Sequence, residues 1–127
     1  ELSYSDLYAR YFQADVLINN VSDVKWYIFG GNYDSNNESA IGDKISSRDG
    51  HSAVLTQNET IIIYGGGTAL YNFIQSEPVL ATLDTTVNPM RWIIPNNSST
   101  SNAPPSLIYH SATLYNNFML ISFGIYY

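Results

Sequence analysis

Short apolar segments alternate with polar turns along most of the chain. Three of these segments, residues 24–29, 61–64 and 119–123, are apolar at nearly every position and have the length of a strand. Continuous apolar runs of this length are typical of strands that are covered on both faces. Each run follows a second strand-like segment and a short polar turn, which predicts a hairpin. The predicted hairpins are 14–18 with 24–29, 51–56 with 60–64, and 108–115 with 118–123.

The middle hairpin is followed by a second predicted hairpin. A loop over residues 67–77 leads to the strand-like segments 79–84 and 90–94, which the turn 85–89 joins. Two consecutive hairpins predict a four-stranded sheet. The first hairpin lacks such a continuation, because the polar stretch 32–47 has room for one short strand at most. We therefore expect the outer half of the first sheet to be missing.

A 59-residue repeat relates the second and third hairpins. The motif His-Ser-Ala-x-Leu begins at His51 and again at His110, and in both copies a glycine follows fourteen residues after the histidine, at Gly65 and Gly124. A weaker copy precedes them, and the three units start near Arg10, Arg48 and Leu107. Repeated units stack because none buries its apolar faces alone. Residues that recur are therefore expected to be architectural, and function is expected where the units differ.

The chain resembles the kelch repeat, a unit of β-propellers. The resemblance is carried by Arg48 and His51, the apolar strand that ends in Gly65-Gly66, the downstream Leu83-Asp84, and Trp92 in the fourth strand. The second unit is the fullest match, and residues 47–55 look most like the fungal kelch proteins of the attractin/muskelin-like propeller group. The third unit departs from the pattern, with Leu107 in place of the arginine and Ile125 in place of the second glycine.

The resemblance implies an all-β fold in which residues 1–127 form a partial propeller of about two to three blades of antiparallel sheet. Propellers close four to eight sheets around a channel, and a kelch repeat runs to about 50 residues. The chain begins with Glu1 rather than methionine, and we expect a processed chain or an excerpt of a larger propeller. An open arc leaves strand edges unpaired. We expect the remaining blades, or self-association, to cover them.

Composition and charge narrow the classes of partner. The net charge is −6 and the five cationic residues are scattered, which argues against nucleic acid and anionic membranes. The absence of cysteine excludes disulfides, thiolate nucleophiles and cysteine-ligated zinc, but it does not settle the compartment. Asn-x-Ser/Thr acceptors favour an extracellular or membrane-tethered parent protein. They lie at Asn20, Asn37, Asn58, Asn96 and Asn97.

The two histidines are the obvious candidates for catalysis or metal binding. His51 and His110 occupy the same repeat position, each at the start of a predicted strand, and each is followed by a serine, Ser52 or Ser111. Recurrence at one position favours a structural hydrogen-bonding role over chemistry. We therefore assign no catalytic, cofactor-binding or metal-binding residue from the sequence.

Other polar and aromatic candidates also favour structural roles. The stretch 65–68 lacks the Gly-Lys-Ser/Thr ending of a phosphate-binding loop and is expected to form a tight turn. The acidic residues Asp34, Glu38 and Asp43 do not fit the spacing of a calcium loop. Burial between sheets is expected for Trp26 and Trp92. The loop residues that could be either a recognition surface or a packed loop are Leu70, Tyr71, Phe73 and Ile74.

The sequence thus predicts a non-catalytic kelch propeller segment that mediates protein–protein interaction through its loops, with no cofactor. Two alternatives remain open. One is a fragment of a galactose-oxidase-like kelch enzyme, although such sites use a cysteine-linked tyrosine and this chain has no cysteine. The other is a glycan-binding propeller whose aromatic loops contact the sugar.

Overall fold

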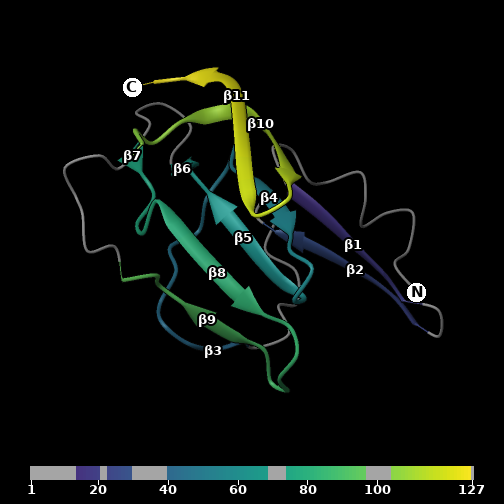
Figure 1. Ribbon diagram of the computed structural model, residues 1–127. Helices are drawn as coiled ribbons and strands as arrows, with labels where there is room; N and C mark the ends of the chain where they lie inside the picture. Colours follow the sequence, from purple (N-terminus) through teal and green to yellow (C-terminus); the bar gives the residue numbers. More distant parts are fainter. Residues whose placement is uncertain (1–13, 21–22, 30–39, 69–73, 97–103, 127) are drawn as a thin grey trace, which may run out of the picture.

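The computed structural model describes residues 14–20, 23–29, 40–68, 74–96 and 104–126 of the chain. These residues form eleven strands and no helix, which confirms the all-β expectation for the part described (Figure 1). The strands belong to four separate sheets, none of them closed into a barrel. No helix that could cross a bilayer is found in the described ranges.

The largest sheet is built mainly by the second unit and has the order β3–β9–β8–β5–β4. Its antiparallel strands are β4 (Ser52–Leu55), β5 (Thr60–Tyr64), β8 (Leu80–Asp84) and β9 (Arg91–Ile93). They form the four-stranded sheet that two consecutive hairpins predict, and the four strands end within one residue of their predicted bounds.

The fifth strand of this sheet comes from the polar stretch before the second unit. β3 (Ile41–Gly42) pairs in parallel with β9, with Gly42 opposite Trp92. It covers the outer edge of the second unit's sheet and does not extend the first hairpin. A Cβ on Gly42, which has a φ of +99°, would lie 2.3 Å from the Trp92 carbonyl oxygen. The close approach of the two strands therefore requires glycine here.

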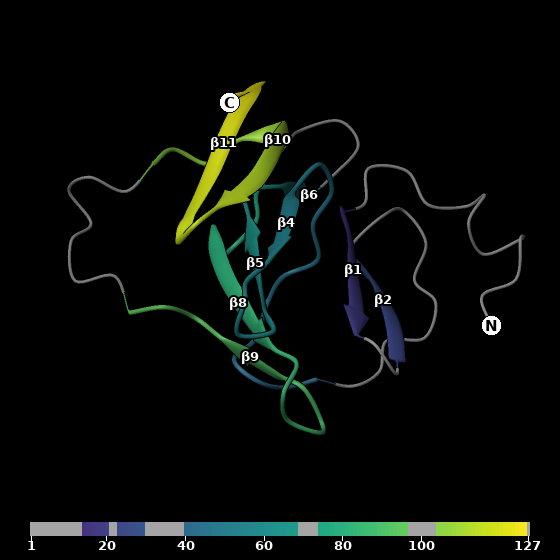
Figure 2. The ribbon, with the colours of Figure 1, turned by 45° about the vertical axis from the view of Figure 1, so that its right-hand side comes forward.

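Two hairpins flank the central sheet (Figure 2). β1 (Ala14–Asn20) pairs with β2 (Asp23–Phe29), and β10 (Ile108–Tyr115) pairs with β11 (Phe118–Ile125), both antiparallel. Both hairpins lie where the apolar pattern predicts them. β4 contacts both β1 and β10. The repeat units are therefore neighbours through their first strands.

The segment that follows β5 differs from its prediction as a continuous loop. Within residues 67–77, β6 (Gly67–Thr68) and β7 (Ile74–Gln75) form a short antiparallel pair. The backbone of Gly67 also exchanges two hydrogen bonds with Asp49, with N–O distances of 2.9 and 3.0 Å. These bonds hold the segment against the start of its own unit, a long-range pairing that local sequence does not reveal.

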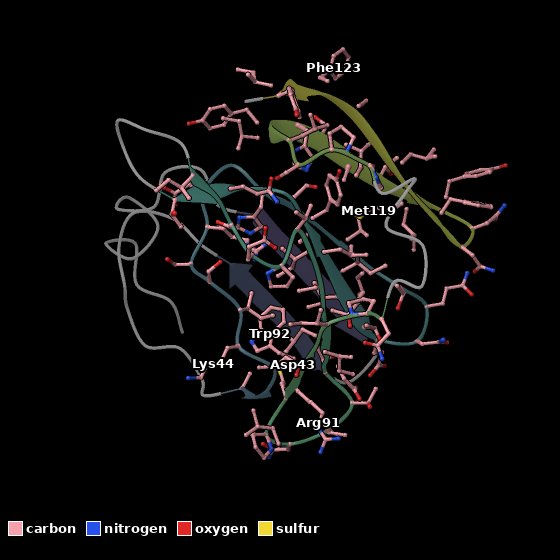
Figure 3. The ribbon with its side chains drawn as sticks, turned by 90° about the vertical axis from the view of Figure 1, so that its left-hand side faces the viewer. Asp43, Lys44, Arg91, Trp92, Met119 and Phe123 are labelled. Carbon is pink, nitrogen blue, oxygen red and sulfur yellow. The ribbon has the colours of Figure 1, made fainter. Side chains whose placement is uncertain are left out.

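The main core cluster lies on one face of the central sheet. Ile61, Ile63 and Leu83 are at most 2% exposed, and Ile61 and Leu83 are cross-strand partners. Burying each of these side chains contributes roughly 2 kcal/mol. Trp92 is half-buried against this cluster and lies far from Phe123 (Figure 3). Trp92 therefore packs against the core of its own sheet and is half-buried, not buried between sheets as predicted. The side chain of Trp26 lies outside what is described.

Candidate functional site

The repeated histidines lie where neighbouring units meet. His51 precedes β4 and His110 lies in β10, and only 5% and 8% of their surfaces are exposed. Because β10 contacts β4, His110 is packed against the second unit. We call the contact between residues 48–67 and residues 105–110 the inter-unit seam.

His110 forms a side-chain hydrogen bond across the seam. Its Nε2 lies 2.7 Å from Ser52 Oγ, and its ring meets the edge of the Tyr64 ring with the centroids 5.5 Å apart. Burial lowers the pKa of His110, so the imidazole stays neutral near neutral pH. A neutral ring nitrogen suits a hydroxyl partner, which can donate or accept. The recurrent histidine therefore links two units.

Three further hydrogen bonds join the two sides of the seam. They run from Gly66 N to Leu107 O (2.9 Å), from Tyr109 N to Gly50 O (2.8 Å), and from the Tyr64 hydroxyl to the Pro105 carbonyl. A Cβ on Gly65 would lie 2.3 Å from the Leu107 carbonyl oxygen and 2.8 Å from His110 Cε1. The glycine is required because two backbones approach each other here. Since the Gly66 amide already has a protein acceptor, it is not presented to a phosphate.

His51 occupies the same repeat position in a different environment. Burial and, to a smaller extent, the positive charge of Arg48 lower the pKa of His51 to about 4. Neither of its ring nitrogens has a well-formed hydrogen bond within the described ranges. The first unit carries Ala14 where the second unit carries Ser52. The hydroxyl that meets His110 therefore has no counterpart for His51.

Arg48 is a buried structural residue at the start of the second unit. Its side chain is 5% exposed, with Nη1 donating to the Gly65 carbonyl at 3.0 Å and Nε donating to the Ser46 carbonyl at 3.3 Å. These bonds tie the start of the unit to the end of β5. In the third unit the equivalent residue is Leu107, which contacts the second unit through its backbone: the Leu107 carbonyl accepts a hydrogen bond from Gly66 N.

The third unit places its glycine differently from what the repeat predicts. The φ angles of Gly65 and Gly66 are +69° and +89°, and those of Phe123 and Gly124 are +63° and +100°. A Cβ on Gly66 would approach His51 Cβ at 2.9 Å, as one on Gly124 would approach His110 Cβ at 2.8 Å. Gly124 is thus the structural equivalent of Gly66, not of Gly65 as the spacing predicts.

The reason for this shift is the length of the hairpin turn. In the β4–β5 hairpin three residues separate Thr56 from Thr60, and Thr56 N donates to Thr60 O at 2.9 Å. In the β10–β11 hairpin only two residues separate the paired Tyr115 and Phe118. A one-residue slip sends side chains to the opposite face of a sheet. Phe123 is accordingly 86% exposed, although its counterpart by spacing, Tyr64, is 3% exposed.

Ser52 and His110 are as close as the nucleophile and general base of a serine hydrolase, but their surroundings are not those of an active site. Ser52 is only 8% exposed within the seam, so a substrate carbonyl has no access to its hydroxyl. Among the described residues no acidic side chain affects the pKa of His110, whereas a catalytic dyad needs a group that orients the base. In the described segments no three His, Asp or Glu residues cluster as metal ligands. The geometry favours a structural role for the pair.

The remaining sequence candidates do not converge on one site. The Asp43 carboxylate accepts a hydrogen bond from Ile94 N at 2.7 Å and so ties β3 to the end of β9. Ile74 is 62% exposed in β7. The candidates that lie outside the described residues are Asp34, Glu38, Leu70, Tyr71 and Phe73.

Sequence reasoning missed a cleft between the second and third units. The hollow has a volume of about 300 Å³ and lies between the β4–β5 turn and the β10–β11 turn. We call it the amide cleft because it is lined by Gln57, Asn58, Asn116 and Asn117. The repeat carries the signal that could have found it, since Gln57 and Asn58 lie 59 residues before Asn116 and Asn117.

Sequence reasoning also missed an exposed apolar surface on the third unit. Its members, which we call the β11 surface, are 50–86% exposed: Tyr115, Phe118, Leu120, Phe123, Ile125 and Tyr126. Residues 108–125 contain no Asp, Glu, Lys or Arg. Within the described ranges β11 pairs only with β10, so its other edge is open. A long, uncharged, open strand edge is a site at which another strand can pair.

Comparison of the chain with protein-family models, with curated proteins and with solved structures gives no match. The resemblance to kelch repeats is therefore carried by the motif residues alone.

Proposed function

We propose that the chain is a non-catalytic segment of a kelch-type β-propeller, and that it binds another polypeptide at the open edge of β11. The β11 surface is the observation that carries the proposal, because it combines large apolar side chains that are at least half exposed with an open strand edge. Exposed apolar surface marks interaction sites, and an open strand edge offers a row of unpaired backbone groups.

The chemistry of the partner follows from the second unit. There β5 pairs with β4 on one edge and with β8 on the other, in antiparallel register. β8 alternates half-buried and buried positions along its five residues. Because the units repeat, the segment that binds the β11 edge is expected to resemble β8. It would be an extended segment that runs antiparallel to β11 and has apolar side chains at alternate positions. Backbone hydrogen bonds supply affinity in such strand addition, and the apolar side chains supply specificity.

The propeller part of the proposal is supported by the arrangement of the units. Their first strands β1, β4 and β10 are neighbours, and the inter-unit seam is built from residues at recurrent positions. Stacking of this kind is expected of repeat architectures, in which each unit contacts its neighbours.

A synthetic peptide of residues 79–94, which has the sequence of the β8–β9 hairpin, is the probe for this edge. We expect labelled peptide to bind the chain in a fluorescence anisotropy titration. A lysine on a strand edge opposes pairing, so Leu120→Lys is expected to weaken binding about tenfold, or by about 1.4 kcal/mol. Val87→Lys, which changes an exposed apolar residue in the β8–β9 turn, is the matched control and is expected to bind like the unmodified chain.

Two results would count against the proposal. One is the absence of peptide binding, and the other is equal binding by Leu120→Lys and Val87→Lys. If the chain by itself forms dimers that the peptide dissociates, a second copy occupies the same edge. Circular dichroism of both variants establishes that each is folded before binding is compared.

A further inference from the structure

The amide cleft brings together polar side chains from two units. The β4–β5 turn contributes Gln57 and Asn58, and the β10–β11 turn contributes Asn116 and Asn117. Half-buried Ile62 of β5 and Leu114 of β10 add apolar surface to the lining. About 300 Å³ is the lower end of the usual size of a ligand pocket. Ligand pockets are usually lined mostly by apolar side chains, whereas polar side chains predominate here, which favours a polar ligand.

The four amides have hydrogen-bonding capacity that the described part of the chain does not use. Each primary amide offers two N–H donors and a carbonyl oxygen. None of the four side chains forms a hydrogen bond to the described part of the chain. The threonines of the cleft differ, because Thr56 Oγ1 accepts from Thr60 N at 3.1 Å and Thr82 Oγ1 donates to the Ile93 carbonyl at 3.1 Å. The amides are therefore the groups available to a ligand.

The charge of the cleft restricts the class of ligand. None of the described residues that line it is Asp, Glu, Lys, Arg or His, although the chain carries a net charge of −6. Among these residues a phosphate or carboxylate group would find no cation, and a cationic ligand would find no carboxylate. An uncharged ligand rich in hydroxyl groups can exchange hydrogen bonds with amides as both donor and acceptor. It can also place a C–H face against Ile62 and Leu114.

We infer that the amide cleft binds an uncharged saccharide of one or two sugar units. This inference does not depend on the proposed binding of a polypeptide, because the cleft lies at the hairpin turns and the strand-pairing site lies along the β11 edge. Saccharide binding at the cleft and peptide binding at the β11 edge can therefore be tested independently.

Nuclear magnetic resonance of the ¹⁵N-labelled chain tests the inference, since side-chain amides give their own signals. The chain is produced in bacteria, so that Asn58, in the acceptor sequence Asn58-Glu59-Thr60, stays unmodified. The probes are lactose, maltose and N,N′-diacetylchitobiose, with glucuronic acid as the anionic comparison. We expect at least one neutral disaccharide to shift the amide signals of Gln57, Asn116 and Asn117 in a saturable manner, with glucuronic acid binding more weakly.

Variants separate the cleft from the rest of the surface. Gln57→Ala removes one amide, and Asn116→Gly removes another while suiting the positive φ of +51° at that position. Each is expected to weaken saccharide binding about fivefold, the effect of a lost hydrogen bond. Asn96→Ala removes an exposed asparagine that does not line the cleft and is expected to leave binding unchanged.

The inference is overturned if none of the three disaccharides shifts these amide signals at concentrations of tens of millimolar. It is equally overturned if Gln57→Ala and Asn116→Gly bind as Asn96→Ala does. Loss of peptide binding at the β11 edge together with retained saccharide shifts would contradict the proposed function and leave the cleft assignment standing.

Discussion

At the scale of single residues, recurrence in the sequence does not mean an equal environment. His51 and His110 share a repeat position and are both buried, yet only His110 has a hydroxyl partner from the neighbouring unit, Ser52. Likewise, Phe123 and Gly65 share a left-handed backbone conformation although they lie 58 residues apart, not 59. The motif predicts a structural role for these positions, but the partners of each side chain depend on which residue the adjacent unit supplies.

The Ser52–His110 bond gives a residue-level prediction. Ser52→Ala leaves Nε2 of a buried imidazole without its partner, which is expected to lower the free energy of unfolding by about 1–2 kcal/mol. Ser111→Ala is the matched control, because Ser111 holds the same repeat position but is exposed. Its effect is expected to stay within about 0.5 kcal/mol. Urea unfolding of both variants measures the difference, and equal losses would remove the seam bond as a stabilising feature.

Phe123 adopts a conformation that costs an L-residue roughly 1–2 kcal/mol. Phe123→Gly relieves that strain at an 86% exposed position and is expected to raise the free energy of unfolding by about 0.5 kcal/mol, after the entropic cost of glycine. Phe118→Gly, at an exposed position of the same strand that does not have a positive φ, is expected to lower it. Thermal unfolding compares the two. A lower stability of Phe123→Gly would show that the strain is absent.

Burial of His51 predicts a stability that falls with acid. The pKa of His51 is about 4 in the folded chain, against its ordinary value of 6.5, so the unfolded chain binds more protons between these pH values. Stability is therefore full above pH 6.5 and falls towards pH 4, by up to about 3 kcal/mol. His51→Gln, which introduces the residue type found in the first unit, is expected to flatten this slope in denaturant unfolding at several pH values. An unchanged slope would assign the loss to other groups.

At the scale of elements, alternating apolar runs and turns predict strands but not their partners across the sheet. Four hairpin positions and the four-stranded sheet of the second unit follow from the sequence, because antiparallel neighbours are adjacent in the chain. The parallel pairing of β3 with β9 and the short pair β6–β7 do not, since both depend on long-range or irregular contacts. The slip of β11 depends on one residue of turn length, which the 59-residue spacing does not reveal. For this reason the sequence does not predict the β11 surface.

The attachment of β3 can be tested through Asp43. Its carboxylate is the acceptor for Ile94 N, and Ile41 N donates to Met90 O at 2.8 Å in the same attachment. Asp43→Ala removes the first bond and is expected to speed amide hydrogen exchange of Ile41 and Ile94 about fivefold, with exchange in β5 unchanged. Equal exchange rates in the variant and the unmodified chain would mean that β3 is held by other contacts.

At the scale of the whole molecule, the residues with a structural role are buried, and the two candidate binding sites lie on the surface. The recurrent His51, His110 and Gly65 are buried in or beside the inter-unit seam, where they are unavailable to a ligand, whereas the four amides of the amide cleft and the members of the β11 surface are exposed. The amide cleft could be anticipated only by aligning the turns of two units. The β11 surface could not, because the internal repeat predicts that the Phe123 side chain lies where the buried Tyr64 lies.

A nuclear Overhauser spectrum of the folded chain tests whether the units stack through their recurrent residues. Such stacking predicts cross-peaks between the Tyr109 amide proton and Gly50, because Tyr109 N and Gly50 O lie 2.8 Å apart, and between the rings of Tyr64 and His110. Cross-peaks within β10–β11, such as His110 to Phe123, serve as the internal reference. If those within the hairpin are present and both seam cross-peaks are missing, the units do not stack through their recurrent residues.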